Sequence, residues 1–315
     1  MKLLVIMPAK NEEKSIGQVI RNIPRDIADK VEVLVVNDGS TDNTSLVAKE
    51  AGADYIIENG KNLGVGHAFF LGINEALKKG ADIIVNIDAD GQFDPNDIKK
   101  LIDPILKNQA DMVTASRFID KSLIPEMPFM KKIGNIMFSR LVSRLSGEIF
   151  FDTQCGFRAY SREACLHMNL FGKFTYTQEV FIDLISKDMR IKEVPVKIYP
   201  RRYGESKVVG NVFLYGFRAL GILLRSFRDY KPLKFFGGIG AVIFFLGFLI
   251  GLFMFLRWLR TGSTTPFRSL LDVALLGMVL GAIIFLMALV ADMLDRSRKL
   301  QEQVLYYERK KELGK

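Results

Sequence analysis

The chain has 315 residues, which is enough for one large or two ordinary domains. Its 44 Lys and Arg outweigh 35 Asp and Glu by 9 charges, and this balance favours a polyanionic partner: phosphate, nucleic acid or an anionic lipid surface. The two cysteines, Cys155 and Cys165, have no metal-ligand spacing and imply no disulfide framework, so we expect free thiols.

The first third of the chain predicts strands that alternate with helices. Residues 3–7 form an apolar run that is too short for a signal peptide and is expected to be the first strand. Further strands are predicted at 31–36, 55–57, 83–87 and 111–115, and helices near 16–23, 43–51, 65–78 and 95–107. Alternation at this spacing indicates an α/β fold with a mostly parallel sheet and helices on both faces.

Polar, acidic or glycine-bearing segments follow three of these strands. They are residues 8–12, 38–42 and 88–92. Ligands of such sheets bind beyond the carboxyl ends of the strands, where the three segments would meet. Acidic groups there have two uses at a nucleotide site: they accept hydrogen bonds from base or ribose, and they hold a metal against the pyrophosphate.

Asp88 and Asp90 stand directly after the apolar strand 83–87, separated only by Ala89. If the strand leaves the sheet there, both carboxylates can turn onto one ion. Mg²⁺ or Mn²⁺ prefers this arrangement of oxygen ligands, and Gln92 offers one more oxygen. An acidic turn after a strand is the competing interpretation.

Basic segments occupy the middle of the chain. Residues 125–147 predict a helix with Lys131, Lys132, Arg140 and Arg144, and its basic face is either solvated or turned to phosphate or membrane. A predicted strand at 193–198 leads to the cationic loop 201–207, which suits phosphate. Residues 208–230 are too charged to span a bilayer and too apolar to be free in water, so an interfacial amphipathic helix fits better than a core helix.

Two uncharged apolar runs follow, at 235–256 and 273–291. The first would be about 33 Å long as a helix, which is enough to cross a bilayer. We therefore expect a two-helix transmembrane hairpin. Basic residues before and after it outnumber those in the link, which puts both termini in the cytoplasm of a multi-pass cell-membrane protein.

Five motifs in order resemble the GT-A family 2 inverting glycosyltransferases, and within them the polyprenyl-phosphate glycosyltransferases such as dolichyl-phosphate mannose synthase. The motifs are at residues 8–13, 36–42, 88–92, 152–158 and 201–207. The resemblance implies a GT-A domain (1–207), an interface helix (208–232), a transmembrane hairpin (233–292) and a charged cytoplasmic tail (293–315). It also implies metal-dependent transfer with Mg²⁺ or Mn²⁺.

The resemblance further implies residue roles. The nucleotide-sugar would be held by Pro8, Ala9, Asn11, Glu12, Asp38, Ala89 and Asp90, and the metal by Asp88, Asp90 and Gln92. The acceptor phosphate would meet Arg117, Lys131, Lys132, Arg201, Ser206 and Lys207. Asp90, Asp152 and Arg201 are the expected catalytic residues, with Asp152 acting either as a base or as a positioner of the acceptor or of an Arg.

The expected reaction transfers a sugar from UDP-glucose, UDP-N-acetylglucosamine or GDP-mannose to dolichyl or undecaprenyl phosphate. The implied partners are this donor, the lipid acceptor, the membrane and a further copy of the chain, with no nucleic acid. One alternative is a processive polysaccharide synthase, although Arg257-Trp258 has Met254 where those enzymes carry a Gln. The other is an inactive adaptor that only binds nucleotide-sugar or lipid.

Overall fold

The computed structural model describes residues 1–124, 127, 129–169, 176–201, 203, 221, 228 and 231–313. Contacts divide the chain into two units, and each is treated by itself. The first comprises residues 1–216 and 305–315, and the second comprises residues 217–304.

The first unit is built on a seven-stranded sheet in the order β3-β2-β1-β4-β6-β5-β7. The strands are β1 (Lys2–Ala9), β2 (Lys30–Asn37), β3 (Tyr55–Glu58), β4 (Ile83–Asn86), β5 (Met112–Ser116), β6 (Arg158–Ser161) and β7 (Ile191–Pro195). Only β6 is antiparallel to its neighbours β4 and β5. The carboxyl ends of β1, β2, β4 and β5 therefore share one edge, where the amino end of β6 also lies.

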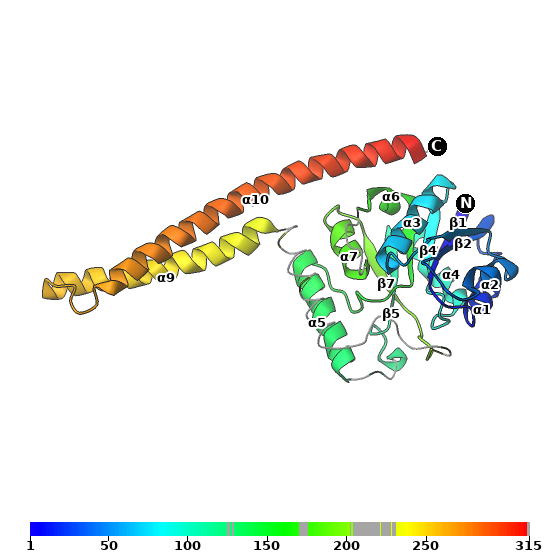
Figure 1. Ribbon diagram of the computed structural model, residues 1–315, viewed down its shortest axis with the longest axis horizontal. Helices are drawn as coiled ribbons and strands as arrows, with labels where there is room; N and C mark the ends of the chain where they lie inside the picture. The colour runs from blue at the N-terminus through cyan, green and yellow to red at the C-terminus, as the bar shows by residue number, and fades with distance from the viewer. Residues whose placement is uncertain are drawn as a thin grey trace. The chain divides into compact units, whose positions relative to one another are not determined.

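Helices cover both faces of this sheet (Figure 1). The helices of this unit are α1 (Ile16–Arg21), α2 (Thr44–Glu50), α3 (Val65–Lys78), α4 (Ile98–Leu106), α5 (Phe129–Ser146), α6 (Arg162–His167) and α7 (Thr177–Ile185), with 3-10 turns η1 (Pro95–Asp97) and η2 (Lys121–Leu123), and α5 packs against α7. The predicted α/β architecture is confirmed. The expected strand 193–198 begins earlier, at Ile191, and the sequence prediction did not include β6.

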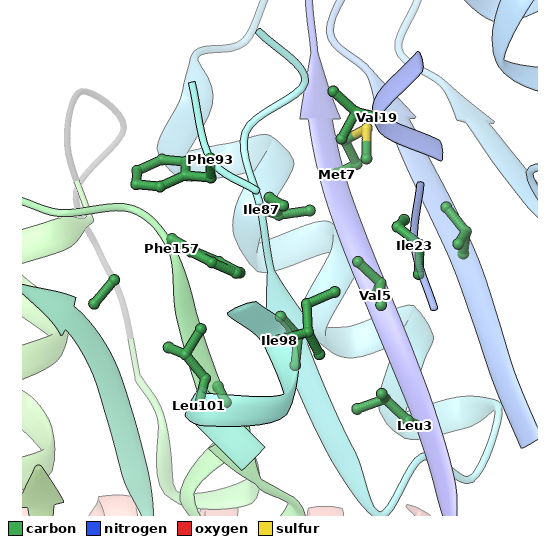
Figure 2. Packing of buried hydrophobic residues seen from close by; sticks show 14 of the residues in the cluster. Leu3, Val5, Met7, Val19, Ile23, Ile87, Phe93, Ile98, Leu101 and Phe157 are labelled. Atoms are coloured by element: carbon green, nitrogen blue, oxygen red, sulfur yellow. The ribbon is translucent and has the colours of Figure 1, made fainter. Parts of the chain in front are cut away.

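The core follows from strand alternation. On one face, Leu3, Val5 and Met7 of β1 pack in a single cluster with α1 and α4, as Figure 2 shows. The opposite face of β1 meets α3, where Gly72 lets the helix approach, since a Cβ there would lie 3.4 Å from Ile6 and Val36. Burial on both faces explains why these strands read as continuous apolar runs.

The second unit contains α9 (Pro232–Thr261) and most of α10 (Ser269–Leu313). Both helices are long and apolar enough to cross a membrane. They pack closely at glycines: a Cβ on Gly247 would lie 2.7 Å from the Met278 nitrogen, and one on Gly281 would lie 2.5 Å from that of Phe244. The predicted interface helix 208–232 lies almost wholly outside the described residues.

The last turns of α10 belong to the first unit. The Tyr306 hydroxyl donates to a Glu163 carboxylate oxygen at 2.5 Å, and its ring stacks on His167 of α6 at 3.9 Å. The Arg309 guanidinium donates to the Met168 carbonyl at 2.8 Å. The charged tail, expected as a helix without a role, thus packs against α6 of the sheet unit.

Candidate functional site

Two carboxylates lie where β4 ends. Asp88 and Asp90 come just after Asn86, the last residue of β4, and Ile87, and both of these residues are buried. The backbone turns immediately afterwards at Gly91, which has a φ of +74°. A positive φ favours glycine, so the sequence permits the turn that holds both carboxylates at the sheet edge. The Gln92 amide N–H donates to Asp90 Oδ1 at 3.0 Å, while its side-chain nitrogen contacts the Tyr199 carbonyl at 3.4 Å.

Asn86, Gly156 and Tyr176 form a hydrogen-bonded cluster next to Asp88. The Asn86 side-chain nitrogen donates to the Gly156 carbonyl at 2.7 Å and contacts the Tyr176 hydroxyl oxygen at 2.9 Å. The Tyr176 ring is stacked on Phe69 at 4.0 Å. A Cβ on Gly156 would lie 3.1 Å from Asp88 Oδ2 and 3.3 Å from the Tyr176 hydroxyl. Glycine at position 156 therefore makes room for the Asp88 carboxylate.

Glu12 and Arg201 form an ion pair beside these carboxylates. The guanidinium of Arg201 donates to Glu12 Oε1, and Ser15 Oγ donates to Glu12 Oε2 at 3.1 Å. Both charges influence Asp88 and Asp90 electrostatically. The pair joins the end of β1 to residues 189 positions later in the chain, and so brings two of the predicted motifs together.

The turns after β1 and β2 are joined by hydrogen bonds. Asn11 takes a left-handed φ of +50°, and its side-chain oxygen accepts from the Thr41 N–H at 2.8 Å. The Asp38 carboxylate accepts from the N–H groups of Leu63 and Gly64, each at 2.9 Å. Asp38 thus organises the turn that opens α3, and it does so from the edge where we predict nucleotide binding.

Burial and mutual repulsion make the Asp88–Asp90 pair electrostatically costly. Burial, followed by the Asp90 charge, raises the pKa of Asp88 to about 7, while Arg201 and Arg158 act to lower it. Burial also raises the pKa of Asp90. Among the described residues, none donates a hydrogen bond to the Asp88 carboxylate. A divalent cation satisfies both carboxylates at once, so the donor set fits Mg²⁺ or Mn²⁺.

The carboxylates come from only two protein residues. No group of three or more His, Cys, Asp or Glu within the described chain could hold a metal ion. A cation on Asp88 and Asp90 would therefore complete its coordination with the Gln92 amide oxygen, water or substrate oxygens. This is the pattern usual for Mg²⁺ sites that bind phosphates.

Arg117 and Asp152 form a second centre on the same edge. Arg117 follows β5, and its Nε and Nη2 donate to the two oxygens of Asp152 at 2.6 and 2.8 Å. Asp152 is completely buried, and its backbone N–H donates to Glu193 at 2.7 Å. Burial raises the pKa of Glu193. This bidentate pair favours the interpretation of Asp152 as the residue that positions an Arg.

The remaining predicted residues divide into three groups. Pro8, Ala9 and Ala89 lie at the ends of β1 and β4 beside Asp38 and Asp88, and Ala9 accepts from the Asp38 N–H at 2.8 Å. Lys132 lies half-buried in α5. Lys131 belongs to α5 without a described side chain, and Ser206 and Lys207 lie outside the described residues.

Sequence reasoning missed Asn86, Gly156, Tyr176 and Glu193. A polar Asn inside the apolar run 83–87 is a signal that could have pointed to Asn86. Gly156 and Tyr176 contact Asn86 from 70 and 90 positions along the chain, and Glu193 accepts from the Asp152 N–H from 41 positions away, so no local pattern indicates their partners.

Comparisons with known proteins identify proteins that this chain resembles. Residues 4–168 match the family model for glycosyl transferase family 2. The chain is 33% identical to the UDP-N-acetylglucosamine–dolichyl-phosphate N-acetylglucosaminyltransferase of Methanococcus voltae, covering 70% of this chain and 94% of that one. It is 28% identical to the polyprenol monophosphomannose synthase of Mycolicibacterium smegmatis, over 67% and 82%.

A solved structure with a similar fold is glucosyl-3-phosphoglycerate synthase from Mycobacterium tuberculosis in complex with Mn²⁺, UDP and glucosyl-3-phosphoglycerate. It has a TM-score of 0.55 and 22% identity, over 70% of this chain and 79% of that one. At this identity the likeness concerns the fold alone, and it confirms the predicted GT-A fold class.

Proposed function

The chain belongs to glycosyl transferase family 2, and from that premise we propose that it transfers a sugar, with inversion, from a nucleotide-sugar to a polyprenyl phosphate. Relatives named for dolichyl-phosphate and polyprenol-phosphate acceptors support the acceptor class. Two helices suited to a membrane support a lipid substrate.

The observation that carries the proposal is the pair of centres on one sheet edge. Asp88 and Asp90 form an acidic pair at the end of β4, and burial raises the pKa of both despite the nearby Arg201. Arg117 supplies a cation at the end of β5, held by Asp152. A cation-dependent site for a donor diphosphate beside a cationic site for an acceptor phosphate is the arrangement that sugar transfer to a lipid phosphate requires.

On the donor side, Asp88, Asp90 and Gln92 would hold Mg²⁺ or Mn²⁺. When bound, the ion supplies Lewis-acid stabilisation of the departing diphosphate. Glu12 holds Arg201 beside the carboxylates, where the guanidinium adds positive charge near the leaving group. The left-handed turn at Asn11 and the Asp38 turn shape the edge where base and ribose would bind.

On the acceptor side, both carboxylate oxygens of Asp152 accept hydrogen bonds from Arg117, and these bonds fix the position of the guanidinium. A phosphate nucleophile is already ionised near neutral pH, so the attack needs no strong general base. We therefore assign Asp152 a positioning role and Arg117 the contact with the acceptor phosphate. Lys132 in α5 is a second cation for the same group.

We also propose the membrane topology. Helices α9 and α10 would cross the bilayer as a hairpin, with the sheet unit and both termini in the cytoplasm, since basic residues flank the hairpin on that side. The processive alternative loses support because Met254 is buried in α9 and Arg257-Trp258 lies within the same helix.

A donor panel tests the proposal. UDP-glucose, UDP-N-acetylglucosamine and GDP-mannose are each incubated with dolichyl or undecaprenyl phosphate and Mn²⁺, and the glycolipid is identified by mass and by its anomeric configuration. We expect a β-linked product from an α-linked UDP-sugar and loss of activity with EDTA. Tight nucleotide-sugar binding without product from any donor would leave the adaptor interpretation standing instead.

A further inference from the structure

Side chains hold the loop that carries Asp152. The backbone N–H groups of residues 150–154 all donate to side-chain oxygens: Phe150 to Ser143 Oγ at 2.9 Å, Phe151 and Asp152 to Glu193 at 2.8 and 2.7 Å, Thr153 to Ser139 Oγ at 3.1 Å, and Gln154 to Asp152 Oδ1 at 3.3 Å. A regular helix or strand would satisfy these N–H groups with backbone carbonyls instead. The position of the Asp152 main chain therefore depends on side chains of α5 and β7.

Glu193 differs in charge from the two serines that hold this loop. Its two oxygens accept from different N–H groups, Oε2 from Phe151 and Oε1 from Asp152. Burial raises the pKa of Glu193, while these two hydrogen bonds act to lower it. A partly buried carboxylate is costly unless its oxygens have donors, so Glu193 and the loop stabilise each other.

Glu193 and Arg117 reach the loop from neighbouring strands. Strands β5 and β7 pair in parallel, and Thr114 of β5 lies opposite Glu193. Arg117 follows β5 directly and bonds to the Asp152 side chain, whereas Glu193 lies within β7 and bonds to the Asp152 main chain. A shift of that main chain would carry the carboxylate away from Arg117, so the Arg117–Asp152 geometry depends on Glu193.

We propose that Glu193 is a positioning residue for the acceptor phosphate. It acts through two other residues: Glu193 fixes the Asp152 main chain, Asp152 fixes the Arg117 guanidinium, and Arg117 meets the phosphate. The inference rests on the proposed function, which assigns this contact to Arg117. A carboxylate suits the role because hydrogen bonds to an ionised acceptor are about twice as strong as bonds between neutral groups.

Glu193→Gln tests this role with the smallest change of shape. The amide keeps an oxygen for one of the two N–H groups and presents its NH₂ group to the other, where two donors oppose each other. Glu193→Asp is a second variant, which keeps the charge but draws both oxygens away from the loop. Ser143→Ala is the matched control, since it removes the acceptor of the Phe150 N–H, two residues from Asp152.

The first measurement needs no sugar transfer. Binding of farnesyl phosphate to the full chain in detergent is measured by calorimetry, without donor or metal. We expect roughly tenfold weaker binding to both Glu193 variants than to the parent, and a change below about twofold for Ser143→Ala. Hydrogen exchange of a peptide spanning residues 150–154 should accelerate in all three variants. Faster exchange with unchanged binding in the Glu193 variants would overturn the proposal, because Glu193 would then support the loop alone.

The second measurement is steady-state transfer. Glu193→Gln should raise the KM for polyprenyl phosphate roughly tenfold and keep kcat within about twofold, because Arg117 contributes binding in the ground state as well. The Mn²⁺ concentration for half-maximal activity should not change, since Asp88 and Asp90 form a separate centre. A lower kcat with an unchanged acceptor KM would contradict the proposal, and so would an equal rise in KM for Ser143→Ala.

The two measurements separate this inference from the proposed function. A parent chain that binds farnesyl phosphate but transfers no sugar to any polyprenyl phosphate would refute the proposed function, while the binding measurement would still decide the role of Glu193. A parent chain that does not bind farnesyl phosphate would overturn both.

Discussion

Two acidic centres at one edge of the sheet are handled in opposite ways. Asp152 is fully buried, and a guanidinium contacts both of its oxygens. Asp88 and Asp90 face each other's charge, and burial raises the pKa of both. The first centre is complete within the protein, so it contributes to folding and presents Arg117. The second has raised pKa values, and added positive charge would stabilise both carboxylates in their ionised form, which is the property expected of a cation site.

Asp90→Ala should have the largest effect. Removal of one of the two carboxylates should lower kcat/KM about 10⁴-fold, equivalent to about 5.5 kcal/mol, since the leaving diphosphate loses its counter-charge. The melting temperature of the EDTA-treated protein should stay the same or rise, because a repelling neighbour of Asp88 is gone. Asp103→Ala, on the exposed side of α4, is the control. Full metal-dependent activity in the Asp90 variant would refute the assignment.

Arg117→Ala should instead destabilise the fold. It leaves Asp152 buried without its counter-charge, at a cost of about 3–5 kcal/mol, measured in detergent as the denaturant dependence of hydrogen exchange in the strands of the sheet unit. The double variant Arg117→Met/Asp152→Leu should recover much of this loss, although transfer stays absent. If the single variant unfolded like the parent, the two centres would not differ as described.

The pH dependence of folding stability should also distinguish the Asp88–Asp90 centre from the Asp152 centre. The folded pKa of Asp88, about 7, lies above its ordinary value of 3.8, so the folded protein binds this proton more tightly than the unfolded chain. Protonated Asp88 therefore contributes its full stabilisation of the fold below about pH 4, and this contribution is lost as the pH rises towards 7. The melting temperatures of the parent and of Asp88→Asn, measured with EDTA, should differ increasingly as the pH rises from about 4 to 7. Mn²⁺ should stabilise the parent more at pH 8 than at pH 5, and equal gains at both would count against the shift.

Gly156→Ala should give the smallest effect. The new Cβ would press on the Asp88 carboxylate, so we expect about a tenfold rise in the Mn²⁺ concentration for half-maximal activity, equivalent to about 1.4 kcal/mol. Far-ultraviolet circular dichroism should be unchanged. Gly60→Ala adds a Cβ into open space and serves as the matched control. Identical metal titrations for the two variants would contradict the prediction, because they would mean that the Asp88 carboxylate moves away from the new Cβ without loss of metal affinity.

Most of the parallel half of the sheet could be predicted from sequence. Strands such as β1 and β2 are buried on both faces and therefore read as unbroken apolar runs. Strand β6 was not predicted because its sequence, Arg-Ala-Tyr-Ser, carries a charge. Arg158 is nevertheless fully buried, where it donates to the Cys155 and Thr153 carbonyls and lies over the Phe181 ring. A buried arginine of this kind depends on tertiary partners that no periodicity reveals.

The same distinction applies to the site. Asp88, Asp90, Glu12 and Arg117 stand next to strand ends, so topology alone places them together. Their partners are different: the hydrogen bond that Arg117 donates to Asp152 spans 35 positions, and the one that Arg201 donates to Glu12 spans 189. The motifs therefore predict Asp152 and Arg201 as site residues, while the pairing of Asp152 with Arg117 and of Arg201 with Glu12 follows only from the folded structure.

The contact of α10 with α6 has a consequence for biosynthesis. Tyr306 and Arg309 lie at the end of α10 and leave the ribosome after the apolar parts of both helices, yet they contact Glu163, His167 and the Met168 carbonyl of the unit that was translated first. The sheet unit can therefore acquire its final surface only after the hairpin has been synthesised. A nascent chain that ends before residue 305 would therefore leave Glu163 and His167 of α6 without these contacts.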